Sequence, residues 1–311
     1  MWKRSIVVLG LVLAFGACMK EDDAYNSAAQ AESDYAAVRY PIVLIPGILG
    51  FEKILGVVEY FPAIPEALSS GGADVYIVYG SKANSSEVRA AQLIPRLEEI
   101  KAITGAERLN LVGHSQGAVD ARIIAARRPD LVASITSVGG PHQGVPLAEK
   151  VDQGTFGPVP AKLLGALADL FTLLSNSTDP NDIDAAMHSL SVTGMAEINA
   201  RYPAALPAEP CGQGTEIVNG IHYYSWGGVG NLTNPVDLLD PVWLLANIAA
   251  PGSNDGLIPR CSSHLGQVIR DDYMHNHIDE TNMLFGLVMP LAARPQALFR
   301  QQANRLKLAG L

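Results

Sequence analysis

Basic runs and long apolar segments are both scarce in this sequence, and each scarcity argues against a class of protein. Lysine and arginine together number 22 against 31 aspartates and glutamates, which gives a net charge of −9 with no arginine-rich run. Because nucleic-acid binding depends on positive patches, nucleic acid is not an expected partner. The apolar stretch Ile6–Phe15 is shorter than a membrane-spanning helix requires.

That N-terminal stretch instead indicates export. It follows two basic residues, as the apolar part of a signal peptide does, and we expect residues 1–18 to be that peptide. Small residues precede Cys18 and resemble a bacterial lipoprotein cleavage box, in which this cysteine would become lipidated; ordinary secretory cleavage is the alternative. Residues 19–38 are polar and without periodicity, as expected of a tether. The protein is therefore expected to be secreted, or anchored to the outer membrane of a Gram-negative bacterium.

Cysteine is rare as well, with three residues in the whole chain. Apart from Cys18 of the leader, only Cys211 and Cys261 remain, and an exported protein can keep them as a disulfide. Two free buried thiols are the alternative. In the chain-entropy model, closing a loop of about 50 residues contributes roughly 4 kcal/mol.

What the chain does have is enough apolar sequence for one large core. Hydrophobic residues make up 48% of its 311 positions and charged residues only 17%. Chains of this length often form a single α/β domain, which we place at residues 39–311.

Apolar strands and helices alternate along the first half of the domain. Strands are expected at 40–45, 73–79, 109–112 and 131–138, and helices at 61–70, 86–104 and 118–126. This alternation predicts an α/β fold whose mostly parallel sheet is covered by helices on both faces. Arg89 is expected on the solvent side of its helix. Strand character returns at 217–226 and again at Val268 and Ile269, before an expected turn at Asp271 and Asp272.

A different pattern occupies residues 145–208, which contain no clear strand and which we expect to form a lid or cap insertion in the domain. Within them, residues 161–174 carry leucine and phenylalanine at spacings of three and four, which predicts a helix with one apolar face. That helix either packs into the core or forms a lid that shields an acyl-binding site.

The most informative motif is Gly113-His114-Ser115-Gln116-Gly117, a match to G-x-S-x-G between an expected strand and an expected helix. A serine at such a sharp strand-to-helix turn has a strained backbone and an exposed hydroxyl. The two glycines are needed because strand and helix pack too closely for side chains. An ordinary glycine-rich turn is the alternative reading.

A nucleophilic serine needs a base, and the base needs an orienting acid. In this fold type both follow the serine in the order acid, then histidine, and lie on late loops. Asp255 in an Asn-Asp-Gly turn and His277 after the last strand are the best candidates. Their rivals are His264, His275, Asp240, Asp271 and Asp272, and chain order alone does not choose among them.

An oxyanion hole needs two backbone N–H groups. One comes from the residue after the nucleophile, Gln116, and the other from the turn after an early strand. Pro46-Gly47-Ile48 is such a turn, so the N–H of Ile48 is the candidate. A plain strand-ending turn is the alternative.

Together these segments resemble the calcium-containing, chaperone-dependent bacterial triacylglycerol lipases of the Pseudomonas and Burkholderia type, which have the α/β-hydrolase fold. The resemblance runs from about Tyr40 to the C-terminus and leaves out only the leader and tether. The segments that carry it are residues 40–44, 50–57, 136–142, 254–257, 261–266 and 276–280.

The resemblance implies a catalytic triad of Ser115, Asp255 and His277. It also implies that Cys211 and Cys261 pair, and that the helix at 161–174 belongs to a lid. The implied activity is hydrolysis of acylglycerols or other esters at a lipid interface, assisted during folding by a lipase-specific foldase. A short-chain esterase, a polyester depolymerase and a non-catalytic lipid- or partner-binding domain are the alternatives.

A structural calcium ion is implied as well, held by Asp240 and Asp279 and by the backbone carbonyls of Met283 and Leu287. Hard oxygen ligands of this kind suit calcium. Three features depart from the family pattern. Pro46 stands where the family has histidine, Met283 stands where it commonly has glutamine, and the lipoprotein-like leader is unusual for freely secreted members.

Overall fold

The computed structural model describes residues 34–51, 53–54, 58–155, 181–237, 240–247, 252–283 and 287–311. The expected signal peptide with Cys18, most of the tether, and the apolar helix at 161–174 lie outside the described residues. Within the described part, the structure contains no helix with the length and apolar character needed to cross a membrane.

The described residues form a central seven-stranded sheet that is mostly parallel. Across it the strands run in the order β4 (Val75–Ile77), β1 (Ile42–Ile45), β5 (Leu109–His114), β6 (Val132–Val138) and β8 (Ile221–Gly228). The far edge of β8 pairs with both β9 (Gln267–Tyr273), in parallel, and β7 (Ile217–Val218), as an antiparallel hairpin. A separate antiparallel pair consists of β2 (Lys53–Ile54) and β3 (Val58–Glu59).

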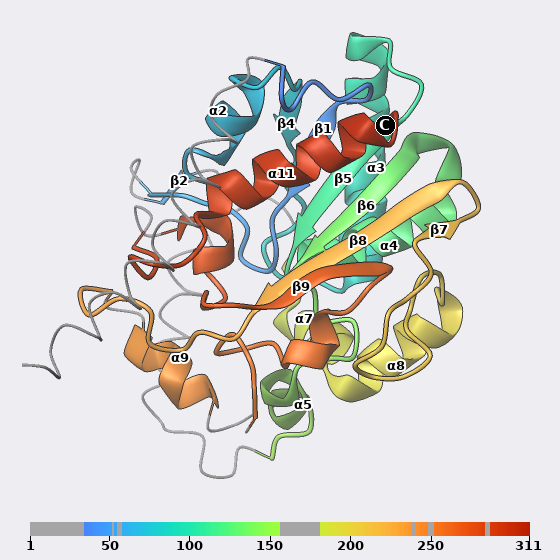
Figure 1. The fold of residues 1–311 in the computed structure, drawn as a ribbon. Helices are drawn as coiled ribbons and strands as arrows, with labels where there is room; N and C mark the ends of the chain where they lie inside the picture. The colour runs from blue at the N-terminus through green and yellow to red at the C-terminus, as the bar shows by residue number, and fades with distance from the viewer. Residues whose placement is uncertain are drawn as a thin grey trace, which may run out of the picture.

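Helices cover both faces of the sheet (Figure 1). On one face lie α2 (Ile64–Ser69) and α11 (Pro295–Leu308), and on the other α3 (Ser86–Thr104) and α4 (Gln116–Arg127). The predicted α/β class and its two-faced helical cover are therefore confirmed. The remaining described helices are α5 (Pro146–Asp152), α7 (Ile183–Leu190), α8 (Val192–Arg201), α9 (Asp240–Asn247), and the 3-10 turns η1 (Pro129–Leu131), η2 (Arg260–Ser263) and η3 (Asp279–Thr281).

Strand β1 shows why the apolar run at its position is continuous. Ile42 and Leu44 point to the face covered by α2 and α11 and belong to their core cluster. Val43 and Ile45 point the opposite way, into the cluster formed with α3 and α4. Because successive side chains of a strand alternate between faces, a parallel strand buried on both sides needs an apolar residue at every position.

Two expectations from the sequence differ from the structure. The single strand expected at 217–226 is a hairpin, because Asn219 and Gly220 adopt φ of 52° and 76° and form a tight turn between β7 and β8. The turn expected at Asp271 and Asp272 was wrong, because both residues lie within β9. Among the described strands β9 pairs only with β8, and such an edge strand can carry charged side chains that a central strand would bury.

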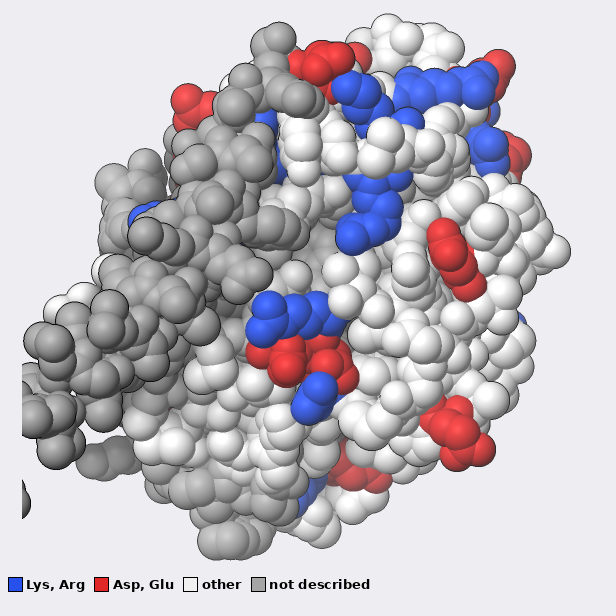
Figure 2. Space-filling model, viewed as in Figure 1, with Lys and Arg blue, Asp and Glu red and all other residues white. Residues whose placement is uncertain are grey.

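Charged side chains of both signs are interspersed on the face shown in Figure 2. A compact group of both signs lies near the middle of this view, in the region of β9. On β9, Asp271 pairs with Arg260 at 2.6 Å, and Asp272 pairs with Arg270 at 2.6 Å.

A disulfide links Cys211 to Cys261, 50 residues apart, with the two Cα atoms separated by 4.7 Å. It is the pairing that the resemblance implied. Beside it, the side-chain amide of Gln143 donates hydrogen bonds to the carbonyls of Pro210 at 2.6 Å and Cys261 at 3.0 Å. The disulfide therefore fastens the loop before β7 to η2, and Gln143 links both to the turn after β6.

Replacing both cysteines by serine should lower the free energy of unfolding by about 4 kcal/mol, because the unfolded chain loses a cross-link that closes a long loop. Urea denaturation measures this difference. Wild-type protein treated with reductant serves as the control and should match the double variant. Equal stability of the oxidised wild type and the double variant would contradict the assignment.

Candidate active site

Ser115 occupies a sharp turn by itself. Strand β5 ends at His114 and helix α4 begins at Gln116. The backbone of Ser115 has φ 54° and ψ −128°, a combination that costs free energy in any residue with a side chain. Two backbone hydrogen bonds hold it there: its N–H donates to the carbonyl of Val138 at 2.9 Å, and its own carbonyl accepts from Ala118 at 3.0 Å.

Glycines surround the turn because nothing larger fits. A Cβ at Gly117 would lie 2.2 Å from the carbonyl oxygen of Ile45, and one at Gly113 would lie 2.4 Å from the backbone of Gly117. A Cβ at Gly47 would lie 2.6 Å from Cβ of Ser115. The end of β1 therefore packs directly on the nucleophile turn, which is the close approach that the motif predicts.

The structure brings the three predicted residues Ser115, Asp255 and His277 together. His277 Nδ1 lies 2.7 Å from Asp255 Oδ2, and His277 Nε2 lies 2.9 Å from Ser115 Oγ. A carboxylate can only accept, so Nδ1 carries the proton and the lone pair of Nε2 faces the serine hydroxyl. All three residues are buried, so the exposed serine hydroxyl that the motif predicts is not found in this structure.

The Asp255 loop is itself held in place. Oδ1 of Asp255 accepts hydrogen bonds from the N–H groups of Leu257 at 2.8 Å and Ile258 at 2.6 Å. The N–H of His277 in turn donates to the backbone carbonyl of Asp255 at 2.8 Å. These bonds leave Oδ2 to orient the imidazole.

The rival histidines have other partners. Nδ1 of His264 bonds to the carbonyl of Gly212 at 2.9 Å, and its Nε2 bonds to Asp271 at 2.9 Å. His275 bonds through Nε2 to the carbonyl of Ala293 at 2.7 Å. No hydrogen bond among the described residues joins either histidine to Ser115, so the geometry favours His277 over these two rivals.

The turn after β1 is fastened by Arg89, which lies on α3 and is 1% exposed. The expectation that Arg89 faces solvent was therefore wrong. Its Nη2 donates to the carbonyls of Pro46 at 2.8 Å and Gly47 at 3.3 Å, and its Nε pairs with Asp120 of α4 at 2.8 Å. In a trans peptide the N–H points opposite to the carbonyl. The hold on the Gly47 carbonyl therefore turns the N–H of Ile48 away from Arg89.

The Arg89–Asp120 pair is sealed from water. Burial raises the pKa of Asp120 to about 6, although the adjacent Arg89 charge opposes the rise. A buried pair of this kind is costly to break, since either partner alone would be left as an uncompensated charge. It therefore ties together the turn after β1, helix α3 and the helix that begins beside Ser115.

Two backbone N–H groups beside the serine are candidates for binding an oxyanion. Among the described residues, the N–H of Ile48 donates to no protein acceptor. Gln116 is the first residue of α4, where N–H groups lack partners within the helix. The side chain of Gln116 points elsewhere and donates to the carbonyl of Asn84 at 2.8 Å.

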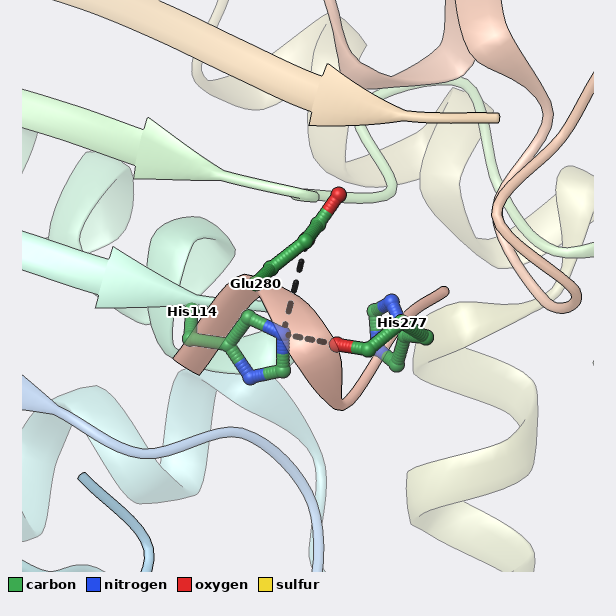
Figure 3. Close-up of side chains that lie close together, drawn as sticks. All are labelled: His114, His277 and Glu280. Carbon is green, nitrogen blue, oxygen red and sulfur yellow. Dashed lines mark hydrogen bonds and ion pairs between the residues drawn. The ribbon is translucent and has the colours of Figure 1, made fainter. Parts of the chain in front are cut away.

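A second buried histidine, His114, lies beside His277, and Glu280 is close to it (Figure 3). The rings of the two histidines are 4.6 Å apart. Burial, and then the neighbouring His277, hold the pKa of His114 well below its ordinary value. Burial, and then the charge of Asp255, raise the pKa of Glu280 well above its ordinary value. Sequence reasoning did not single out His114 or Glu280, and no spacing rule points to them.

The proposed calcium ligands Asp240 and Asp279 are also buried and close together. Asn276 bridges them: its N–H donates to Oδ2 of Asp279 at 3.1 Å, and its side-chain amide donates to Oδ1 of Asp240 at 2.9 Å. Burial raises the pKa of Asp279 to about 7, and the nearby carboxylates of Asp237 and Asp240 add to the rise. Of the other two, Met283 is buried and Leu287 is partly exposed, while residues 284–286 between them lie outside the described part.

Comparison with known proteins identifies the family of this chain. The model of the alpha/beta hydrolase fold family matches residues 40–226. A triacylglycerol lipase of Vibrio cholerae is 43% identical and covers 92% of this chain and 93% of its own length. One of Pseudomonas fragi is 39% identical and covers 89% of this chain and 99% of its own length.

Among solved structures, the mature form of a Bacillus licheniformis lipase has a similar fold. Its TM-score is 0.60 at 16% identity, over 87% of this chain and 93% of that one. At this identity the likeness concerns the fold alone. The family model and the sequence relatives carry the assignment: the chain belongs to the α/β hydrolase family and, within it, to the bacterial triacylglycerol lipases.

Proposed function

We propose that this hydrolase cleaves the ester bonds of acylglycerols through an acyl-enzyme formed on Ser115. The observation that carries the proposal is the Ser115–His277–Asp255 hydrogen-bond relay at the end of a strained strand-to-helix turn. That geometry supplies a nucleophile, a base within reach of its proton and an acid that orients the base.

In the first half of the reaction, His277 Nε2 takes the hydroxyl proton while Ser115 Oγ attacks the ester carbonyl. The N–H groups of Ile48 and Gln116 stabilise the negative charge on the tetrahedral oxygen. The protonated His277 then gives its proton to the departing alcohol, and the acyl group remains on Ser115.

In the second half, water takes the place of the alcohol. His277 removes a proton from that water, which attacks the acyl carbonyl, and the fatty acid leaves as Ser115 recovers its proton. Throughout, Asp255 keeps the proton of His277 on Nδ1 and stabilises the imidazolium that forms at each step.

An apolar surface near the site supports a lipid substrate. Helix α9 lies beside the catalytic loop, with the rings of Trp243 and His277 6.3 Å apart. The same helix exposes Leu244 by 43%, and the segment before it exposes Leu232 by 57% and Val236 by 65%. Exposed apolar side chains next to a buried acyl-transfer site suit contact with an emulsion or membrane surface.

We also propose that Asp240, Asp279 and the carbonyls of Met283 and Leu287 hold a structural calcium ion. Within the described part of the chain, neither carboxylate forms an ion pair with lysine or arginine, and Oδ1 of Asp279 has no hydrogen-bond partner. Two buried carboxylates without a countercharge fit a divalent cation with oxygen ligands. A bound ion would supply positive charge that anchors the loop of His277, two residues from Asp279.

Export remains part of the proposal, together with a lipid anchor at Cys18 and assistance from a lipase-specific foldase. Its support is the leader sequence and the similarity to the lipases of Vibrio and Pseudomonas.

Replacing Ser115 by alanine should reduce turnover of p-nitrophenyl esters by roughly 10⁴-fold or more, because no other group can form the acyl-enzyme. The matched control is Ser134→Ala, a buried serine of β6 that bonds to Asn110, and it should keep wild-type turnover. Undiminished turnover by a correctly folded Ser115→Ala variant would reject the mechanism.

A series of p-nitrophenyl esters from acetate to palmitate, with and without an emulsion, tests the substrate class. We expect the highest rates on long chains and a gain at the interface, and Leu244→Ser should lose more of that gain than Leu308→Ser, an exposed leucine of α11. Best activity on soluble short esters without interfacial gain would instead favour a short-chain esterase or polyester depolymerase.

Removing calcium with a chelator should lower the melting temperature, because a ligand that binds only the folded state stabilises it. Asp279→Asn should abolish the response to the chelator, whereas Asp272→Asn on the edge strand β9 should keep it. Thermal unfolding with and without chelator measures both. No change in melting temperature or in activity at elevated temperature would show that the site is wrong or unimportant.

A further inference from the structure

The residue directly before the nucleophile makes two hydrogen bonds that the mechanism above does not use. His114 is 1% exposed at the end of β5. Its Nδ1 lies 2.7 Å from the hydroxyl of Tyr60, and its Nε2 lies 2.9 Å from the backbone carbonyl of His277. Figure 3 shows the second of these bonds crossing directly from the His114 ring to the His277 main chain.

The direction of each bond follows from its end groups. The N–H of Gly47 donates to the hydroxyl oxygen of Tyr60 at 2.9 Å, so the hydroxyl proton remains available for Nδ1 of His114. A carbonyl can only accept, so Nε2 of His114 must carry the proton given to His277. The result is one ordered series of hydrogen bonds, which runs from the N–H of Gly47 through Tyr60 and His114 to the carbonyl of His277.

This series of hydrogen bonds requires a neutral His114. A charged ring would carry a proton on Nδ1 and donate it to the hydroxyl oxygen of Tyr60. That oxygen would then accept from both Gly47 and His114, and the hydroxyl proton would lose its acceptor. Burial disfavours the charged ring, in line with the lowered pKa of His114. Glu280 approaches Nε2 only to 3.6 Å, farther than the carbonyl of His277, and so does not displace that bond.

We propose that Tyr60 and His114 are positioning residues for ester hydrolysis. They align two segments with Ser115: the turn after β1, which carries the N–H of Ile48, and the loop that carries His277. The inference rests on the proposed function of Ser115, Asp255 and His277. It adds two residues that touch neither the substrate carbonyl nor the transferred proton.

Both ends of this series of hydrogen bonds affect the site, beginning with the turn after β1. Arg89 holds the carbonyl of Gly47, and Tyr60 holds the N–H of the same residue. With both peptide groups of Gly47 fixed, the N–H of Ile48 has one direction. At the other end, the bond from His114 fixes the main chain of His277, so its ring needs only the bond to Asp255 to face Ser115.

Tyr60→Phe tests the link between Gly47 and His114 by removing a single hydroxyl. We expect kcat to fall about 10-fold to 100-fold with KM within a factor of about three, because the lost alignment acts in the transition state. Tyr224→Phe is the matched control, since this tyrosine of β8 is also buried and its hydroxyl bonds to Glu216, just before β7, at 3.1 Å. The control should keep wild-type kcat.

A second readout separates positioning from plain stability. The rates on p-nitrophenyl butyrate and on its thiono analogue, whose carbonyl oxygen is sulfur, give a ratio that reports hydrogen bonding to the oxyanion. Sulfur accepts weaker hydrogen bonds, so a well-aligned hole favours the oxygen ester. Tyr60→Phe should lower this ratio, and Tyr224→Phe should leave it unchanged.

Variants of His114 test its two hydrogen bonds separately, and this test does not depend on correct folding of Tyr60→Phe. His114→Asn places an acceptor near the position of Nδ1 and should preserve the oxygen-to-thiono ratio. His114→Gln places a donor near Nε2 and should preserve the branch to His277 while lowering the ratio. His114→Leu removes both and should show the lowest kcat of the three.

The outcomes are distinct. Lower melting temperatures with unchanged kcat and unchanged ratio in Tyr60→Phe and His114→Leu would overturn the positioning role and leave a structural one. Equal kcat in the leucine, asparagine and glutamine variants would overturn it too. If Ser115→Ala keeps full turnover, the failure belongs to the proposed function and not to this chain of hydrogen bonds.

Discussion

The close approach of the β1 turn to the start of α4 is the constraint on which the rest of this site depends. There is no room for a Cβ at Gly47, Gly113 or Gly117, and the backbone of Ser115 is held at a φ of 54° between them. This packing sets the turn that carries Ile48 and the start of α4 directly against Ser115. The strain at Ser115 persists because the surrounding sheet and helix allow no other path for the chain.

Polar groups complete what the packing begins. Arg89 and Asp120 pair beneath the turn after β1, Asp255 fixes the proton of His277, and His114 bonds across to the main chain of His277. Each of these groups is buried, and each bond has a definite donor and acceptor. In a medium of low polarity such bonds are worth more than at the surface, and an unpaired member would be costly. The site is therefore ordered before substrate arrives, as electrostatic stabilisation of an oxyanion requires.

Local features of the sequence were enough to predict the strand, turn and helix around Ser115, since apolar periodicity and two glycines specify them without distant contacts. Helix 86–104 was predicted with the bounds that α3 has. The burial of Arg89 was missed because its partner Asp120 is 31 residues away and only the folded chain joins them. The same limit left His264, His275 and His277 unresolved by chain order. Asp271 and Asp272 were misplaced in a turn because edge strands tolerate charges that usually mark loops.

Trapping the acyl-enzyme tests the central claim most directly. The protein would be mixed with a p-nitrophenyl ester, quenched in acid within the first turnover, digested and analysed by peptide mass spectrometry. The account predicts that the acyl mass appears on the peptide that contains Ser115 and disappears as the ester is consumed. An acyl group on any other residue, or steady turnover with no acylated peptide at any quench time, would contradict it.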